Sequence, residues 1–340
     1  MKLSVICPIF NEEKYIEKCI QSVIDSDFPK DDMELLLIDG GSVDRTREII
    51  AEFTGKCNWI KLLDNPKRIV PCALNLGVAA AQGEFIIRID AHTTYEANYF
   101  SSLLNWHEKL QADNVGTVCK TDVLNKNPKT LAIREVLCNK FGVGNATFRT
   151  GTDTLQEVDT VPFGCWRKDI FSRLGGFNEN LIRNQDIEFN KRILRDGGKI
   201  YLVSDSFCTY YARETWAKIS KNNFQNGKWN ILTIAYTGHL NSISLRHLIP
   251  LFFVLSLLGP SILGGILSFF VPWGWVISLL SAASLAAYLL LIGLVSLSLT
   301  FHKKLNFFYL VITFIVLHIS YGWGTLTGLL TEAGRIFKRK

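Results

Sequence analysis

The octapeptide FIIRIDAH, residues 85–92, is an apolar run that ends in a carboxylate, a small residue and an imidazole. Such a short, nearly uninterrupted apolar run is typical of a strand buried in a parallel sheet. In these sheets ligands bind just beyond the carboxyl ends of the strands, where Asp90 and His92 stand. A carboxylate and an imidazole at one point suit a divalent ion such as Mg2+ or Mn2+. An isolated Asp-x-His is also compatible with an ordinary polar turn, so its interpretation depends on the rest of the chain.

Three earlier segments predict further strands of the same sheet. Leu3–Cys7, Leu35–Ile38 and Trp59–Leu63 are short and mostly apolar, and segments with helical spacing separate them. Four strands that alternate with three helices predict a doubly wound, mostly parallel, Rossmann-like α/β sheet.

Polar side chains follow three of the four predicted strands. The carboxyl ends of neighbouring parallel strands meet at one edge, so these groups are expected to line one crevice. The chain lacks both Gly-x-Gly-x-x-Gly and Gly-x-x-x-x-Gly-Lys, which argues against a dinucleotide or P-loop site. A mononucleotide held through its base and ribose, with its phosphates on a metal, fits better. The side chains in question are Asn11 and Glu12 after the first strand, Asp39 and Asp44 after the second, and Asp90 and His92 after the fourth.

The C-terminal part of the chain has the composition of a membrane region. Three apolar stretches, 248–270, 273–299 and 307–330, are each long enough to cross a hydrocarbon core of about 30 Å, which takes about 20 residues. The third contains His318 and several glycines, so a re-entrant or interfacial helix is its alternative. We expect no signal peptide at the first strand, because its apolar run is short and breaks at Pro8. We therefore expect a multi-pass protein of the inner cell membrane with a cytoplasmic catalytic domain.

The charges and the cysteines agree with this location. The net charge of +6 is concentrated beside the apolar stretches, at Arg246, at Lys303–Lys304 and in the tail 335–340. This placement favours positive-inside anchoring in a membrane over nucleic-acid binding. The eight cysteines include no Cys-x-x-Cys pair, so they indicate neither a zinc knuckle nor a disulfide framework.

An ordered set of motifs resembles family 2 glycosyltransferases of the GT-A fold. Pro8-x-x-Asn11-Glu12, Asp39-Gly-Gly-Ser42-x-Asp44 and Asp90-Ala-His92 are similar to the nucleotide-sugar half of that family. VPFGCWR (161–167), GGFNE (175–179), NQDIE (184–188) and QNGKW (225–229) are similar to its acceptor-side segments. With the C-terminal apolar block, the chain looks most like the membrane-anchored succinoglycan or exopolysaccharide glucosyltransferase branch. The resemblance implies a GT-A domain over 1–235, with a nucleotide-sugar half (1–125) and an acceptor half (126–235), before a helical membrane region over 236–340.

The resemblance implies nucleotide-binding roles for the first two turns. Asp39 is expected to contact uracil or another base, and the turn from Pro8 through Phe10 and Asn11 to Glu12 is expected to line the base and ribose pocket. A turn-capping role is the alternative for Asp39. Asp44 is either a nucleotide ligand or a first-turn carboxylate favoured by the helix dipole.

The third turn is expected to bind the diphosphate and a metal. Asp90 is expected to bind the ribose or the metal, and His92 stands at the last position of the family's Asp-x-Asp motif. A histidine there keeps a ligand atom but removes one negative charge, which shifts the preference from Mg2+ toward Mn2+.

Asp186 is the residue that we expect to act as catalytic base. The family's inverting reaction is a single displacement, in which an acceptor hydroxyl attacks the anomeric carbon and needs a carboxylate within reach. A metal offsets the charge that gathers on the leaving diphosphate. Gln185 stands where the family often has Glu, so one carboxylate of that pair remains. Glu188 is expected to face away from Asp186 as a surface charge.

Two further segments are expected to meet the acceptor or the diphosphate. Gly164 and Trp166 lie in a predicted acceptor wall, where Trp166 either stacks on a sugar ring or packs. Arg213 and Lys228 are candidates for the diphosphate, and Gln225 belongs to the same motif as Lys228. Lys228 replaces an Arg and lacks its bidentate fork, which favours single additions over processive polymerisation. The last residue of that motif, Trp229, serves either the acceptor site or anchoring at the membrane interface.

These features predict a hexosyltransferase that moves a sugar from a nucleotide-sugar, a UDP-hexose, to a membrane-lipid-linked saccharide. A transferase that glycosylates polyprenyl phosphate directly is a close alternative. A channel or transporter that senses nucleotides and a non-catalytic nucleotide-binding scaffold are alternatives from other classes. The apolar stretches contain one imidazole and no acidic residue. A transport path usually has more ionisable side chains within the membrane, so this composition argues against a transporter.

Overall fold

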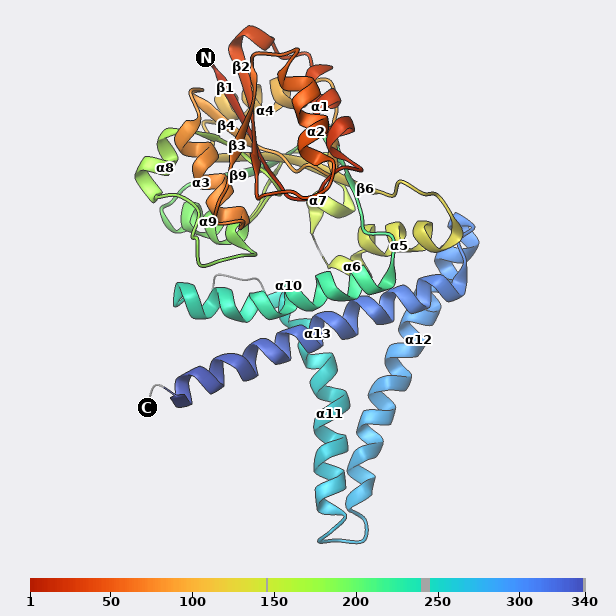
Figure 1. Ribbon diagram of the computed structural model, residues 1–340. Helices are drawn as coiled ribbons and strands as arrows, with labels where there is room; N and C mark the ends of the chain where they lie inside the picture. The colour runs from red at the N-terminus through yellow and green to blue at the C-terminus, as the bar shows by residue number, and fades with distance from the viewer. Residues whose placement is uncertain (145, 240–244, 339–340) are drawn as a thin grey trace. The chain divides into compact units, whose positions relative to one another are not determined.

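A computed structural model describes residues 1–144, 146–239 and 245–338, with side chains up to residue 332 in the last helix (Figure 1). The chain forms two compact units, one of residues 1–122 and 146–211 and the other of residues 123–145 and 212–340. The functional division expected at residue 235 stays a prediction. The side chains of the basic tail, 335–340, lie outside the described part.

The first unit is built on one mixed sheet with strand order β3-β2-β1-β4-β8-β6-β9-β5, in which β7 pairs with β9. The strands β1 to β4 run parallel, as predicted, and Ile9 is level with Asp39 at their carboxyl ends. β8 is inserted antiparallel between β4 and β6. The strands are β1 (Leu3–Ile9), β2 (Met33–Asp39), β3 (Ile60–Asp64), β4 (Phe85–Arg88), β5 (Thr93–Tyr95), β6 (Asn114–Asp122), β7 (Gln156–Glu157), β8 (Cys165–Arg167) and β9 (Ile200–Tyr211).

Helices cover both faces of this sheet (Figure 1). Alternate residues of β1 face opposite sides, so Val5 packs with α1, α2 and α4, whereas Ile6 packs with α3, α8 and α9. Both faces are therefore buried, which explains the continuous apolar runs of the parallel strands. The helices of this unit are α1 (Ile16–Ile24), η1 (Lys30–Asp32), α2 (Thr46–Thr54), α3 (Val70–Ala80), α4 (Tyr99–Leu110), α7 (Thr147–Thr150), α8 (Asp169–Leu174) and α9 (Gln185–Arg195).

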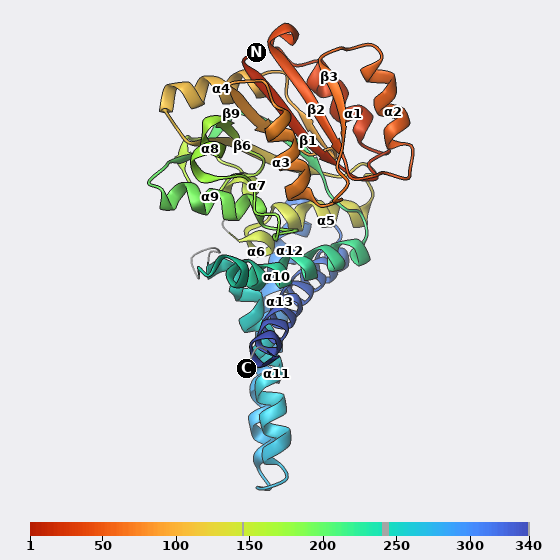
Figure 2. The ribbon, with the colours of Figure 1, turned by 60° about the vertical axis from the view of Figure 1, so that its left-hand side comes forward.

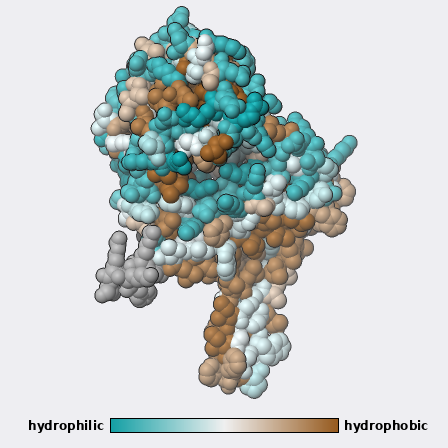
Figure 3. Space-filling model, in the orientation of Figure 1, coloured by the Kyte–Doolittle hydropathy of each residue, from teal (hydrophilic) through white to brown (hydrophobic). Residues whose placement is uncertain are grey.

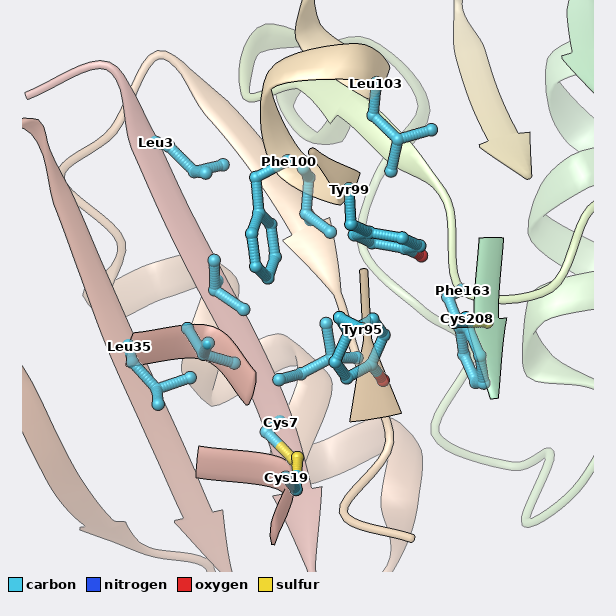
Figure 4. Close-up of a cluster of buried hydrophobic side chains, with 14 of the residues drawn as sticks. Leu3, Cys7, Cys19, Leu35, Tyr95, Tyr99, Phe100, Leu103, Phe163 and Cys208 are labelled. Atoms are coloured by element: carbon cyan, nitrogen blue, oxygen red, sulfur yellow. The ribbon is translucent and has the colours of Figure 1, made fainter. Parts of the chain in front are cut away.

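The larger core cluster lies on the α1 and α4 face, where aromatic rings from α4 meet aliphatic residues of the central strands (Figure 4). Tyr99 and Phe100 are almost completely buried there. Cys7 and Cys19 lie side by side in the same cluster, and all eight cysteines of the chain are free thiols. This core fixes the strands whose carboxyl ends carry the candidate site.

The second unit is helical. α11 and α12 form a long hairpin, whereas α13 packs along α10 and also contacts α5 (Figures 1 and 2). Its helices are α5 (Pro128–Cys138), α6 (Lys140–Val143), α10 (Trp216–Thr237), η3 (Leu245–Leu248), α11 (Ile249–Leu267), η4 (Gly274–Ile277), α12 (Ser278–Lys303) and α13 (Phe307–Lys338).

Three helical stretches of the described chain are long and apolar enough to cross a membrane, namely Leu245–Leu267, Gly274–Lys303 and Phe307–Glu332. In the view of Figure 3, apolar side chains cover one side of the α11–α12 hairpin, and residues of intermediate hydropathy cover much of the other side. The third stretch differs, because 33% of its most apolar window is buried inside the protein, against 17% and 11% for the first two. The third stretch is therefore apolar enough to cross a membrane but packs more extensively against the rest of the protein than the first two do.

Candidate active site

Hydrogen bonds join the turns that follow β1 and β2. Asn11 donates its backbone N–H to Ser42 Oγ (2.8 Å) and accepts one from Val43 at its side-chain Oδ1 (2.9 Å). Glu12 donates its backbone N–H to Thr46 Oγ1 (2.8 Å). Asn11 has a φ of 55°, a left-handed conformation that asparagine tolerates well. The two turns therefore form one connected ledge at the carboxyl edge of the sheet.

The residues before this ledge differ in exposure. Pro8 is buried within β1, level with Ile38 of β2, so its side chain is part of the core. Phe10 is 52% exposed and is free to line a pocket. Of these two predicted pocket residues, the structure therefore leaves Phe10 accessible.

Asp39 is completely buried, and its oxygens are occupied by its own turn. They accept hydrogen bonds from the backbone N–H groups of Gly41 (3.2 Å) and Ser42 (3.1 Å). The Ser42 hydroxyl (2.6 Å) and Arg47 Nη1 (2.7 Å) also donate to this carboxylate. These contacts match the turn-capping alternative, and a direct contact of Asp39 with a base stays a prediction.

Asp44 also holds its own turn together. Its Oδ1 accepts from the backbone N–H of Thr46 (3.1 Å) and the Thr46 hydroxyl (2.5 Å), and its Oδ2 accepts from the backbone of Glu13 (3.2 Å). Burial by itself raises the pKa of Asp44, but these hydrogen bonds outweigh burial and lower the pKa. The contacts are those expected of a carboxylate at a helix start.

His92 lies between two carboxylates that come from different turns. Its Nδ1 is 3.0 Å from Glu12 Oε1, and its Nε2 is 3.9 Å from Asp90 Oδ2. Its ring also packs edge-on against Tyr210, with centroids 4.9 Å apart. Burial lowers the pKa of His92, but Asp90, Tyr210 and Glu12 outweigh burial and raise the pKa to about 10. The contact of His92 with Glu12 therefore connects the third turn to the first.

The same geometry fits a weakly held divalent ion. A histidine that binds a metal through one nitrogen usually holds a carboxylate through the other, as His92 Nδ1 holds Glu12. His92 Nε2 then faces Asp90 across a 3.9 Å gap. Among the described residues, no group of three or more His, Cys, Asp or Glu side chains is arranged for a metal. The donor set therefore suits an ion that takes its remaining ligands from water and substrate phosphates, as Mg2+ often does.

Asp186 lies in the first turn of α9 and faces β4. Its Oδ2 is 3.6 Å from Nη1 of Arg88, the last residue of β4, and its side chain is 32% exposed. The Arg88 side chain is 8% exposed and stacks over Phe163, 5.8 Å from the ring centroid. In the described part of the chain, Arg88 Nε and Nη1 have no hydrogen-bond partner. The structure thus brings Asp186 to the strand that leads to Asp90, beside a buried cation.

Buried amides fix α9 against the sheet. Asn114 Nδ2 donates to Asn190 Oδ1 (2.7 Å), and Asn190 Nδ2 donates to Thr160 Oγ1 (2.9 Å). Asn114 and Asn190 are both at most 1% exposed, so these hydrogen bonds form away from water. The helix that carries Asp186 is therefore held by its middle as well as by its first turn.

The expectation that Glu188 is a surface charge is wrong. Glu188 is 4% exposed and accepts two hydrogen bonds from Arg192, at 2.8 and 2.7 Å. Arg192 also donates to the carbonyl oxygens of Leu174 (2.7 Å) and Gly176 (2.9 Å). The Glu188–Arg192 pair therefore connects α9 to the end of α8 and the loop that follows it.

Trp166 is a packing residue rather than an exposed wall. Its side chain is 1% exposed and lies among Phe171, Phe177 and Phe189, with centroids 5.9 to 6.1 Å away. No face of the ring is left for a sugar, so its placement as an acceptor contact is wrong and the packing alternative holds. Gly164 beside it has a φ of 91°, and its carbonyl accepts from the Arg88 backbone (3.2 Å).

The remaining predicted contacts are distributed over both units. Gln185 begins α9, is 6% exposed and has no partner for Oε1 among the described residues. Arg213 precedes α10, whereas Gln225, Lys228 and Trp229 lie on that helix, so all four belong to the second unit. Their part in the transfer site stays a prediction.

Three residues near the site have no role in the sequence interpretation. Arg88 was detectable, because it is the one charged residue within the apolar run 85–89. Phe163 lies in the acceptor-side segment VPFGCWR (161–167), but its stacking on Arg88, like the packing of Tyr210 on His92, joins segments far apart in the chain and so has no local sequence signal.

Comparison with known proteins gives a consistent result. Residues 4–175 match the model of "Glycosyl transferase family 2". A Methanococcus voltae dolichyl N-acetyl-alpha-D-glucosaminyl phosphate 3-beta-D-2,3-diacetamido-2,3-dideoxy-beta-D-glucuronosyltransferase is 30% identical over 75% of this chain and 81% of its own length. The succinoglycan biosynthesis protein ExoA of Rhizobium meliloti is 29% identical over 73% of this chain and 74% of its own. The solved mannosyltransferase PcManGT of Pyrobaculum calidifontis, in complex with GDP-Man and Mn2+, aligns with a TM-score of 0.60 over 96% of this chain and 87% of its own, at 15% identity.

The turn at Gly164 generates a stability prediction. A Cβ at Gly164 would collide with the Trp166 ring and Asn114 Oδ1, in addition to the strain of its positive φ. Gly164→Ala should therefore lower the free energy of unfolding by about 3 kcal/mol, as measured by denaturant unfolding of the full chain in detergent. Gly151 is the matched control, because it has a φ of 89° but no described heavy atom within 4 Å of such a Cβ. Gly151→Ala should cost about 1 kcal/mol, and equal losses in the two variants would contradict the packing explanation.

Proposed function

The chain belongs to glycosyl transferase family 2 and has the GT-A fold, and from this premise we propose that it moves a sugar from a UDP-hexose to a membrane-lipid-linked saccharide in polysaccharide biosynthesis. The observation that carries the proposal is the Asp186 carboxylate, which is partly exposed and lies 3.6 Å from a buried cation on β4. A carboxylate in that position can accept the proton of an attacking hydroxyl.

The donor nucleotide is proposed to bind along the ledge formed by the first two turns. Phe10, Asn11 and Glu12 are proposed to line the base and ribose pocket, with Asp39 and Asp44 behind them. The hydrogen bonds of Asp39 and Asp44 within their turns support an indirect role, in which these carboxylates fix the backbone that the nucleotide meets.

A divalent metal, Mn2+ or Mg2+, is proposed to bind at Asp90 and His92. When bound, the ion offsets the negative charge that gathers on the leaving diphosphate. Glu12 orients the His92 ring through Nδ1, and this contact supports the assignment.

Transfer is proposed to be a single displacement with inversion. Asp186 takes the proton from the acceptor hydroxyl while that oxygen attacks the anomeric carbon and the nucleoside diphosphate leaves from the opposite face. Arg88 orients the Asp186 carboxylate through their ion pair. Gln185 and Gly164 are proposed to border this point, and Arg213, Gln225, Lys228 and Trp229 to serve the acceptor or the diphosphate.

The names of two relatives support the acceptor class. One is named for a dolichyl-linked sugar phosphate and the other for succinoglycan biosynthesis. The apolar helices of the second unit support membrane association, and we propose an inner-membrane location with the catalytic unit in the cytoplasm. Direct transfer to polyprenyl phosphate is the alternative, whereas family membership favours an enzyme over a channel or a scaffold.

Asp186→Asn should abolish transfer but not donor binding. The amide keeps the shape of the side chain but accepts no proton, so kcat should fall about a thousandfold. The assay is UDP release with a lipid extract as acceptor, next to calorimetric titration of UDP. Asp169→Asn, an exposed carboxylate of α8, is the control and should leave both values unchanged. Weaker UDP binding with normal transfer would refute the base assignment.

His92→Ala should weaken UDP binding in the presence of Mn2+ by at least about tenfold, because a metal ligand is lost. In EDTA the variant should bind UDP only slightly more weakly than the wild type, because the contact of His92 with Glu12 is lost. Both conditions can be measured by titration calorimetry. If the variant keeps the full difference between Mn2+ and EDTA, His92 is not a metal ligand.

Arg88→Met should lower kcat about a hundredfold with little change in the KM of the donor, because Asp186 loses the partner that orients it. Arg88→Lys retains the charge without the planar fork and should recover part of kcat. Arg167→Met, at an exposed arginine of β8, is the control. A raised donor KM with normal kcat would instead assign Arg88 to the diphosphate.

A further inference from the structure

α10 and α13 are joined at close range along their length. Gly324 lies directly against the carbonyl of Phe224, and Gly328 lies against the carbonyl of Lys228. Asn230 Nδ2 also donates to the Tyr321 hydroxyl at 2.7 Å. Side chains larger than hydrogen at these glycines would separate the helices, so α10 and α13 form a fixed pair.

The polarity of α10 decides where this pair can lie. α10 carries Lys218, Lys221 and Lys228 together with several asparagines. Lysine is among the side chains that are most costly to place at the centre of a membrane, so an α13 that crossed the bilayer would carry an unfavourable partner helix with it. The lysines therefore favour a position of the pair at the membrane surface, with the α11–α12 hairpin as the part that crosses.

α13 also exposes an apolar stripe on one side. Its spacing of four and seven residues places the side chains on a single helical face, as in helices that lie in a membrane interface. The stripe consists of Phe308 (71% exposed), Ile312 (38%), Ile319 (36%), Trp323 (49%) and Leu330 (66%).

An apolar groove of about 690 Å³ runs between α10 and this stripe. Its volume lies within the range of about 300 to 1,000 Å³ that is common for small-ligand sites. Lys221 stands at its side and forms no ion pair within the described part of the chain. The lining residues are Trp216, Ala217, Ser220, Lys221 and Phe224 of α10 and Ile315, Val316, Ile319, Ser320 and Trp323 of α13.

We propose that this groove binds the apolar chain of a lipid phosphate, with Lys221 beside the phosphate. An isoprenoid chain can pack against the aromatic and aliphatic walls of the groove. The phosphate at its end carries a negative charge that can pair with the Lys221 ammonium group. The inference rests on the proposed function, because it identifies the groove as the place where the carrier lipid of the acceptor is held.

Photolabelling tests the groove without requiring sugar transfer. The full chain, in phosphatidylcholine nanodiscs, is irradiated with a farnesyl monophosphate that carries a benzophenone, and labelled peptides are identified by mass spectrometry. Label should appear in residues 216–224 and 315–323. Ala217→Trp fills the groove and should reduce this label about tenfold, the effect of excluding about two methylene groups. Ala235→Trp, at an exposed alanine of α10 outside the groove, should not reduce it.

The phosphate is tested separately. Lys221→Gln should reduce labelling about threefold, whereas Lys218→Gln, on the same helix outside the groove, should not. The benzophenone analogue of farnesol should label less than the phosphate in the wild type. Equal labelling by alcohol and phosphate would overturn the role of Lys221.

Three other results would overturn the site itself. They are label confined to α11 and α12, equal effects of Ala217→Trp and Ala235→Trp, and full competition by phosphatidylglycerol or by inorganic phosphate. Competition by phosphatidylglycerol would identify the groove as a general lipid contact, and competition by inorganic phosphate would identify a simple anion site. Groove labelling without UDP release from any donor would leave the site standing and refute the proposed function.

Discussion

The buried guanidinium of Arg88 at the end of a central strand is the constraint on which the site depends. An unpaired charge in the interior costs several kcal/mol, and Asp186 is the carboxylate that approaches it, at 3.6 Å. β4 and α9 are far apart in the chain, so this requirement draws the first turn of α9 to the edge where β4 ends. The buried hydrogen bond between Asn114 and Asn190 then holds the middle of the same helix. A charge in a strand thus sets the position of the candidate base.

The location of the site at the carboxyl edge of the sheet can be predicted from the sequence, because strands and the polar residues that follow them are recognised from local patterns. Short apolar runs predict parallel strands, and the polar residues after them must meet at one edge, as Asn11, Glu12 and His92 do. The direction of each carboxylate was not predictable. The turn after β2 leaves backbone N–H groups without strand partners, and Asp39 satisfies them. An acidic residue at a strand end can therefore serve its own turn, and sequence spacing alone does not distinguish this role from ligand binding.

Long-range packing explains the other differences between sequence and structure. Trp166 is buried because Phe171 of α8, Phe189 of α9 and Phe177 of the loop between them surround it. Glu188 is buried because Arg192 neutralises it and also donates to the carbonyls of Leu174 and Gly176, 18 and 16 residues earlier in the chain. The apolar composition of α13 is compatible with a membrane span. Its contact with the lysine-bearing helix α10 depends on which face of each helix meets the other, and composition does not show this.

The partly exposed carboxylate of Asp186 also bears on the choice between a lipid-linked saccharide and a polyprenyl phosphate as the acceptor. A polyprenyl phosphate would bring an ionised oxygen toward Asp186, and two negative charges at hydrogen-bond distance repel each other. A saccharide hydroxyl is neutral and needs the proton acceptor that a phosphate does not need. Arg88 is paired with Asp186 and so offsets only part of this repulsion. With Asp186 as the proposed base, a saccharide hydroxyl is therefore the favoured reacting group, and in a lipid-linked saccharide the charged phosphate is separated from that hydroxyl by the sugar itself.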